Sequence, residues 1–149
     1  MKIIMIKNGV GGANTQTGTN YEKQVQAPIQ GEGWINVSKH NLYSYLKSIK
    51  INWKNIISKK LLPDEAYFNP VTKEFKIFEK KFQQTSGSVD EKPQTCGFKI
   101  KQFEKIGKVL GAVSTTYTYI FNSWFKKPEY KDMLEYIDSV PGCSYIFME

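Results

Sequence analysis

The order of hydrophobic and polar residues predicts strands in the middle and at the end of the chain. Within residues 65–83, apolar and polar residues alternate on both sides of an Asn69–Pro70 turn, which is typical of a two-stranded hairpin. The β-branched and aromatic run at 113–122 predicts a central strand, and the run at 143–147 predicts a last one.

Apolar residues at steps of three and four predict the helices between these strands. The first helix is expected over residues 17–26, and residues 41–60 form either one interrupted helix or two short ones. A further helix is expected from a cap at Asp90 to about Leu110, and Pro128 opens another. The face that packs on the sheet is expected to carry Cys96, Ile100, Phe103, Gly107 and Leu110.

This order of elements predicts an α/β fold in which a central mixed sheet of four to five strands is flanked by helices. The composition is 40% hydrophobic and 14% aromatic, which supplies enough apolar material for one compact core. We therefore expect residues 1–149 to form a single domain, with a glycine-rich connecting loop at 8–18. The spacing of glycines in this loop matches neither the P-loop nor the dinucleotide-binding pattern.

Charge and cysteine content bear on partners and compartment. The formal charge of +7 makes a polyanion a plausible partner, although lysine can also simply fill a solvated surface. All 21 basic residues are lysine, so the bidentate guanidinium contact to guanine is absent. Cys96 and Cys143 have no metal-binding spacing, and His40 is the single histidine. With no signal peptide or membrane-spanning run in the sequence, we expect a reducing, cytoplasmic setting and no membrane partner.

One face of the second hairpin strand changes character along its length. Because side chains alternate between the two faces of a strand, Phe75, Ile77, Glu79, Lys81 and Gln83 share one face. The first two are apolar and the rest are charged or polar. This change indicates that the strand leaves the core at Glu79 and enters a site.

The residues around this point resemble the signature of the PD-(D/E)XK nuclease superfamily. Pro63-Asp64 is followed by Glu79-x-Lys81 at a spacing that suits a hairpin. The resemblance implies a restriction-endonuclease-like core in which Asp64 and Glu79 share a divalent metal. Glu22, on the first predicted helix, corresponds to the additional acidic residue of many family members.

The resemblance implies that the protein hydrolyses a phosphodiester with the help of a metal ion. Asp64, Glu79 and the backbone carbonyl of Lys80 would hold Mg²⁺, with Mn²⁺ as a possible substitute. Lys81 would orient or deprotonate the attacking water, or offset charge in the transition state. Gln83 continues the motif as Glu-x-Lys-x-Gln and would position water or DNA.

The partner expected from the resemblance is DNA. The lysines expected to contact it are Lys47, Lys50, Lys54, Lys59, Lys60, Lys99 and Lys101. For each cluster of lysines, a solvated helix surface is an equally good interpretation. A restriction-type enzyme that cuts duplex DNA as a homodimer or higher even oligomer is the leading hypothesis. A junction-resolving or phage repair nuclease of the same superfamily is an alternative, and so is a non-catalytic DNA-binding module.

Overall fold

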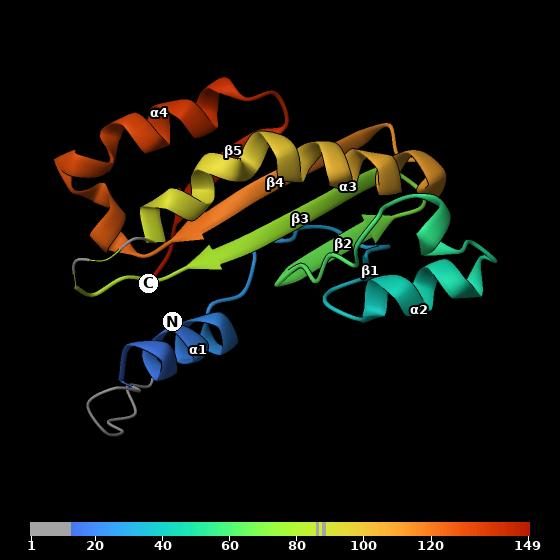
Figure 1. Ribbon diagram of the computed structural model, residues 1–149. Helices are drawn as coiled ribbons and strands as arrows, with labels where there is room; N and C mark the ends of the chain where they lie inside the picture. The colour runs from blue at the N-terminus through green and yellow to red at the C-terminus, as the bar shows by residue number, and fades with distance from the viewer. Residues whose placement is uncertain (1–12, 86, 88) are drawn as a thin grey trace.

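A mixed sheet forms the centre of the molecule (Figure 1). The computed structural model describes residues 13–85, 87 and 89–149. Within this part of the chain the sheet has five strands in the order β1-β2-β3-β4-β5. The strands are β1 (Ile35–Asn36), β2 (Glu65–Asn69), β3 (Glu74–Lys81), β4 (Ser114–Phe121) and β5 (Cys143–Phe147). The pairs β1–β2 and β2–β3 are antiparallel, whereas β3–β4 and β4–β5 are parallel. The predicted α/β domain with a mixed sheet is confirmed.

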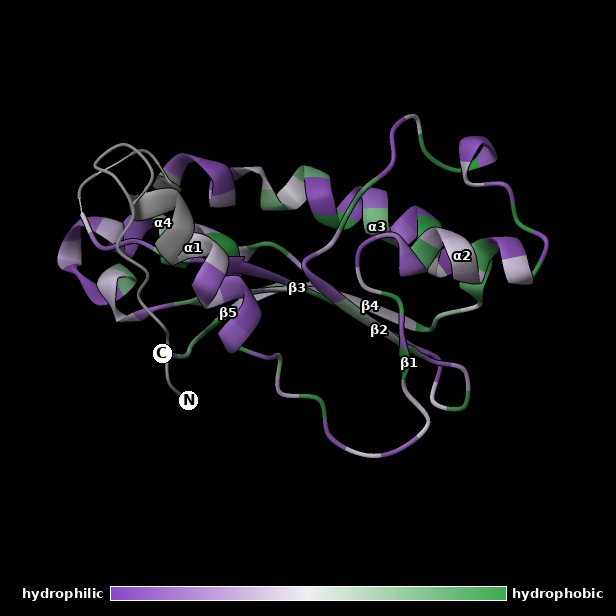
Figure 2. Ribbon diagram, turned by 90° about the horizontal axis from the view of Figure 1, so that it is seen from below, coloured by the Kyte–Doolittle hydropathy of each residue, from purple (hydrophilic) through white to green (hydrophobic). Residues whose placement is uncertain are grey.

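Helices cover both faces of this sheet. The α-helices are α1 (Ala13–Gln24), α2 (Asn41–Ser48), α3 (Cys96–Leu110) and α4 (Lys131–Ser139). The 3₁₀ helices are η1 (Trp53–Asn55), η2 (Val89–Thr95), η3 (Ser123–Lys126) and η4 (Pro128–Tyr130). The main core joins α2, α3 and α4 to one face, and a smaller cluster joins α1 to the other. Figure 2 shows bands of hydrophilic and hydrophobic residues along α2 and α3, as expected for helices with one buried side.

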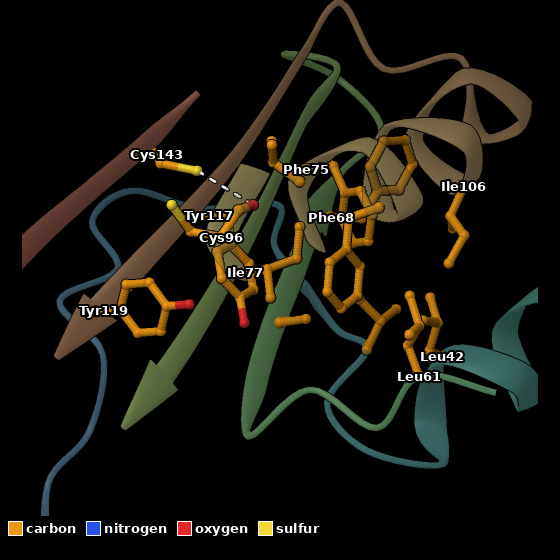
Figure 3. Close-up of a cluster of buried hydrophobic side chains, with 14 of the residues drawn as sticks. Leu42, Leu61, Phe68, Phe75, Ile77, Cys96, Ile106, Tyr117, Tyr119 and Cys143 are labelled. Carbon is orange, nitrogen blue, oxygen red and sulfur yellow. Dashed lines mark hydrogen bonds between the residues drawn. The ribbon is translucent and has the colours of Figure 1, made fainter. Parts of the chain in front are cut away.

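The hairpin of β2 and β3 carries apolar side chains into the main core. Phe68 and Phe75 are register partners, and Ile77 lies two residues further along β3. Figure 3 shows these side chains close to Ile106 of α3 and Leu42 of α2. Burial of this cluster holds the hairpin against two helices, so the ends of β2 and β3 keep a fixed position.

The predicted turn at Asn69–Pro70 joins the two strands of the hairpin. The side-chain Oδ1 of Asn69 accepts hydrogen bonds from the backbone N–H groups of Val71 and Thr72, at 3.0 and 3.1 Å. Lys73 then adopts a left-handed φ of +63° and donates its N–H to the Asn69 carbonyl. An asparagine that bonds its own turn in this way sets the register of the hairpin.

The long helix α3 packs closely on the sheet through the face that the sequence predicts. Cys96, Ile100, Phe103, Gly107 and Leu110 are all buried. A Cβ atom at Gly107 would collide with Oγ1 of Thr115 on β4, so any larger residue would force the Thr115 side chain or the helix to move. Gly111 ends the helix with a φ of +78° in the left-handed region.

Helix boundaries differ from the prediction at three places. Helix α1 begins at Ala13, so residues 13–18 of the predicted loop are helical, and residues 8–12 lie outside the described part. The helix expected from Asp90 begins only at Cys96, because Pro93 lacks an N–H and holds the preceding turns as 3₁₀ helix. Between residues 41 and 60 two short helices form, since Lys50 takes a left-handed φ of +62° after α2.

Strand boundaries also differ. The short strand β1 was not expected, because two residues carry no alternating pattern. Strand β3 ends at Lys81, so Gln83 lies beyond the strand on which the sequence placed it.

Candidate active site

The hairpin brings the carboxyl groups of Asp64 and Glu79 together. Asp64 directly precedes β2, and the register of Glu65 with Phe78 places it beside Glu79 on the neighbouring strand. The Oδ2 atom of Asp64 accepts a hydrogen bond from the backbone N–H of Lys80 at 2.8 Å. The two carboxyl groups are close enough for Asp64 to raise the pKa of Glu79. The pairing expected from the sequence is therefore present in the fold.

The environment of Glu79 favours the protonated acid. The pKa of Glu79 is raised to about 8, first by burial and then by the nearby negative charge of Asp64. The positive charges of Lys81 and Lys99 lower this pKa. Two neighbouring carboxylates repel each other when both are ionised, so a proton or a cation near them stabilises the pair.

A cavity of about 320 Å³ opens beside this carboxyl pair. Its walls are Glu79, Lys81, Lys92, Thr95, Lys99, Tyr117 and Tyr119. Glu79 and Tyr119 are register partners on β3 and β4, which explains why they line the same cavity. The cavity is thus one in which a carboxylate meets several lysines, an arrangement suited to an anion held near a cation.

Lys39 is a neighbour of Asp64 that the sequence did not indicate. Its Nζ lies 3.4 Å from Oδ1 of Asp64, and about half of its side chain is exposed. The backbone N–H of Lys39 donates to the Pro63 carbonyl at 2.9 Å, which holds the residue beside Asp64 despite a left-handed φ of +50°. The two residues are 25 positions apart, and no sequence pattern links them.

Glu22 lies on α1, near enough to Asp64 to feel its charge. Its side chain reaches solvent, yet partial burial raises its pKa and the Asp64 carboxylate raises it further. Lys39, Lys81 and Lys80 lower this pKa in turn. The fold therefore places Glu22, the predicted third acidic residue, near Asp64.

The side chains of Lys80 and Glu65 form a separate buried pair on the opposite face of the hairpin. Lys80 Nζ lies 2.6 Å from Oε2 of Glu65, and it also donates to the backbone carbonyl of Glu22 at 2.7 Å. Glu65 accepts further hydrogen bonds from the Ala27 N–H and the Tyr67 hydroxyl. This network ties the end of α1 to the hairpin. It also confirms that Glu65 faces away from Asp64, as strand alternation predicts.

Gln83 lies after β3 and is held by the chain around it. Its backbone N–H and carbonyl bond the side chain of Asn122, at 3.1 and 2.8 Å. Its own amide Nε2 donates to the Thr85 carbonyl at 2.5 Å. Gln83 is not among the described residues that line the cavity beside Glu79. A role for Gln83 in positioning water or DNA stays a prediction.

The lysines predicted to contact DNA occupy different surfaces. Lys99 lines the cavity beside Glu79, whereas Lys101, two residues further along α3, is exposed on another side of the helix. The remaining predicted lysines, on α2 and around η1, are Lys47, Lys50, Lys54, Lys59 and Lys60, and all are exposed. Lys99 and Lys101, which were expected to act together, therefore lie on different sides of α3.

The chemistry of the carboxyl pair suits a hard divalent cation. Among the described residues, no three side chains of histidine, cysteine, aspartate or glutamate come together as a metal-binding group. Magnesium needs only one or two carboxylates, since it keeps several waters and takes up substrate phosphate oxygens. Asp64 and Glu79 supply two neighbouring carboxyl groups at the end of the hairpin. These residues therefore fit the predicted ion.

Comparison with known proteins gives one family. The model of a PD-(D/E)XK nuclease superfamily domain matches residues 13–94, which is more than half of the chain. The matched segment runs from α1 into η2 and contains Glu22, Asp64, Glu79 and Lys81. No curated protein and no solved structure matches the chain. In the described residues no helix is long and apolar enough to cross a membrane.

Proposed function

Since the chain belongs to the PD-(D/E)XK nuclease superfamily, we propose that it is a magnesium-dependent DNA endonuclease. The family implies a nucleic-acid substrate and hydrolysis of its phosphodiester bonds. The observation that carries the proposal is the placement of Asp64 and Glu79 side by side on neighbouring strands at the end of the hairpin.

The metal ligands in this proposal are Asp64, Glu79 and the backbone carbonyl of Lys80. A magnesium ion held by these residues would polarise the phosphate and lower the pKa of a bound water molecule. Asp64 is oriented for binding because the N–H of Lys80 fixes one carboxylate oxygen, at 2.8 Å. Mn²⁺ has similar preferences for oxygen ligands and is expected to substitute.

The lysines of the cavity have separate tasks. Lys81 lies beside Glu79 and is proposed to orient the attacking water and to carry its proton. Lys99 faces the same cavity from α3 and is proposed to hold the substrate phosphate. Glu22 is proposed to bind the ion through a water molecule, because its side chain reaches solvent near Asp64.

The finer role is also a proposal. A restriction-type enzyme cuts both strands of a duplex, and one small site per chain favours a two-fold dimer for this task. A junction-resolving or repair nuclease would use the same carboxyl pair on branched DNA. We also propose a reducing, cytoplasmic setting, which the two buried free thiols of Cys96 and Cys143 support.

Cleavage of supercoiled plasmid DNA tests the catalytic proposal. Wild-type protein should nick or linearise the plasmid with magnesium and stop when EDTA is added. Asp64→Asn removes a proposed metal ligand and Lys81→Met removes a proposed acid–base group, and each should lower the rate by about a hundredfold or more. Glu74→Gln is the matched control, because Glu74 is a partly exposed carboxylate at the other end of β3.

Two outcomes would contradict the catalytic proposal. Cleavage that continues in EDTA, or that survives Asp64→Asn at the wild-type rate, would remove the carboxyl pair from the mechanism. Salt-sensitive DNA binding with no cleavage under magnesium or manganese would instead indicate a non-catalytic DNA-binding module.

A further inference from the structure

A second cavity lies between α2 and η1 and shares no lining residue with the cavity beside Glu79. Its volume is about 420 Å³. The side chains that matter for its chemistry are Tyr43, Lys47, Lys50, Asn52, Trp53 and Lys60. None of its lining residues is acidic. Helix α2, which carries Tyr43 and Lys47, lies at the β1–β2 end of the sheet, while α4 lies at the β5 end (Figure 1).

The aromatic wall of this cavity is held firmly. The rings of Tyr43 and Trp53 meet edge to face, with centroids 5.8 Å apart and planes at 74°. The Tyr43 hydroxyl donates to the Leu61 carbonyl at 2.6 Å and accepts from the Leu61 N–H at 2.5 Å. Both hydrogen bonds are buried, so the ring of Tyr43 is fixed against the segment that leads to Asp64.

Positive charge converges on these rings. The Nζ of Lys60 lies 5.0 Å from the centroid of the Tyr43 ring and 5.7 Å from that of Trp53. In the described part of the chain, no carboxylate forms an ion pair with Lys47, Lys50 or Lys60. Lysines without counterions beside a partly buried aromatic surface match the two halves of a nucleotide, its phosphate and its base.

We propose that this cavity binds an unpaired nucleotide of the nucleic-acid substrate, an inference that rests on the proposed nuclease function. A base inside a duplex is stacked on its neighbours, so its face is available to a protein ring only when the nucleotide is unpaired. The volume is larger than a phosphate needs and falls within the range of roughly 300–1,000 Å³ that small-molecule sites occupy. The preferred substrate is therefore DNA with a single-stranded, gapped or branched segment.

Binding measured in EDTA separates this site from catalysis. The probes are a fluorescently labelled single-stranded oligonucleotide and a blunt duplex of the same length. Trp53→Leu should weaken single-strand binding by about tenfold, the loss typical of one stacked base, and Lys60→Gln should weaken it through the loss of a phosphate contact. Duplex binding should change by less than about threefold, because only phosphate contacts are lost there.

Lys127→Gln is the matched control. Lys127 is also exposed, and its Nζ lies 3.2 Å from the centroid of the Trp124 ring, so the variant removes the same charge from a similar aromatic contact. It should bind both probes as the wild type does. Lys60 is exposed, so Lys60→Gln should leave the fold intact. This variant therefore still tests the cavity if Trp53→Leu lowers stability.

Two more probes identify the chemistry of the ligand. An abasic oligonucleotide keeps the phosphates and should bind the wild type about tenfold more weakly than the normal strand. Equal binding of both strands, or equal losses for single strand and duplex in the variants, would overturn the proposal in favour of a phosphate groove. Saturation by a free deoxynucleoside monophosphate at lower concentrations than the oligonucleotide would overturn it in favour of a free nucleotide.

Plasmid cleavage with magnesium distinguishes the two proposals. If wild-type protein cleaves DNA while Trp53→Leu and Lys60→Gln bind single strands normally, only the assignment of this cavity is wrong. If the binding pattern is as expected but no cleavage occurs, the nucleotide site is supported and the nuclease proposal fails.

Discussion

At the scale of single residues, the ammonium group of Lys39 forms an ion pair with Asp64, a proposed metal ligand. The ammonium is 3.4 Å from Oδ1 of Asp64, on the oxygen that Lys80 does not bind. Lys39→Gln should therefore bind Mg²⁺ or Mn²⁺ more tightly, by up to about fivefold, the limit for a partly exposed ion pair. Isothermal titration without DNA measures this affinity.

Lys73→Gln is the control for this substitution. Lys73 is exposed and has a similar left-handed backbone, with φ of +63° against +50° for Lys39. Any cost of placing glutamine in that conformation is therefore the same in both variants. If the metal affinities of the two variants are equal, Lys39 does not compete for Asp64.

The pKa of Glu79 gives a second prediction at this scale. Its folded-state pKa of about 8 exceeds the ordinary value of 4.5, so between these pH values the metal-free folded protein holds a proton that the unfolded chain releases. Stability without metal should therefore fall as pH rises through this window. In EDTA, raising the pH through this window should lower the melting temperature of the wild type more than that of Glu79→Gln. The difference should be at least about 3 °C, the shift that roughly 1 kcal/mol gives.

Melting curves recorded from pH 5 to pH 8 for both proteins test this titration. Parallel curves for the wild type and Glu79→Gln would show that Glu79 does not titrate there. Adding magnesium should raise the melting temperature of the wild type more at the upper end of the window, because the ion competes with the proton for the same carboxylate.

At the scale of elements, the buried pair of Lys80 and Glu65 joins α1 to the hairpin. Lys80→Met would leave the Glu65 carboxylate buried without its cation, which costs about 3–5 kcal/mol of unfolding free energy. Lys76→Met on the same strand removes a half-exposed partner of Glu74, and its cost should stay below about 1 kcal/mol. Urea denaturation measures both. Equal losses would mean that the pair does not support the fold.

The hairpin and its carboxyl pair could be predicted from the sequence because their signals are local. Alternation along 75–81 fixes which side chains share a face, and the turn at Asn69 fixes the register that brings Asp64 beside Glu79. The early part of α3 was harder to predict. A helical pattern from Asp90 onward is overridden by Pro93, so the α-helix begins at Cys96.

The rest of the candidate site depends on contacts between distant segments. Tyr119 lines the cavity because β4 pairs with β3, and a strand's own pattern does not specify its neighbour. Lys39 follows a two-residue strand too short to show a period. Lys99 and Lys101 look equivalent in the sequence, but the helix turns only Lys99 toward the carboxyl pair.

At the scale of the whole molecule, the charge of +7 alone does not say where a nucleic-acid substrate would bind. Counterion release depends on the lysines that meet phosphates, so their position decides the salt dependence of binding. The α2–η1 cavity carries Lys47, Lys50 and Lys60, and replacing all three with glutamine should lower the slope of log affinity against log salt by about 2–3. A tailed duplex in EDTA is the substrate for this measurement.

The same charge can be removed from another surface as a control. Lys126, Lys127 and Lys131 are exposed between η3 and α4, and changing all three to glutamine leaves the net charge equal to that of the first triple variant. If DNA lies over the α2–η1 cavity, this control should keep the wild-type slope. Equal slopes in the two triple variants would mean that overall charge, rather than a defined path over α2 and η1, governs binding. A change confined to the first would place the nucleic acid across the β1–β2 end of the sheet.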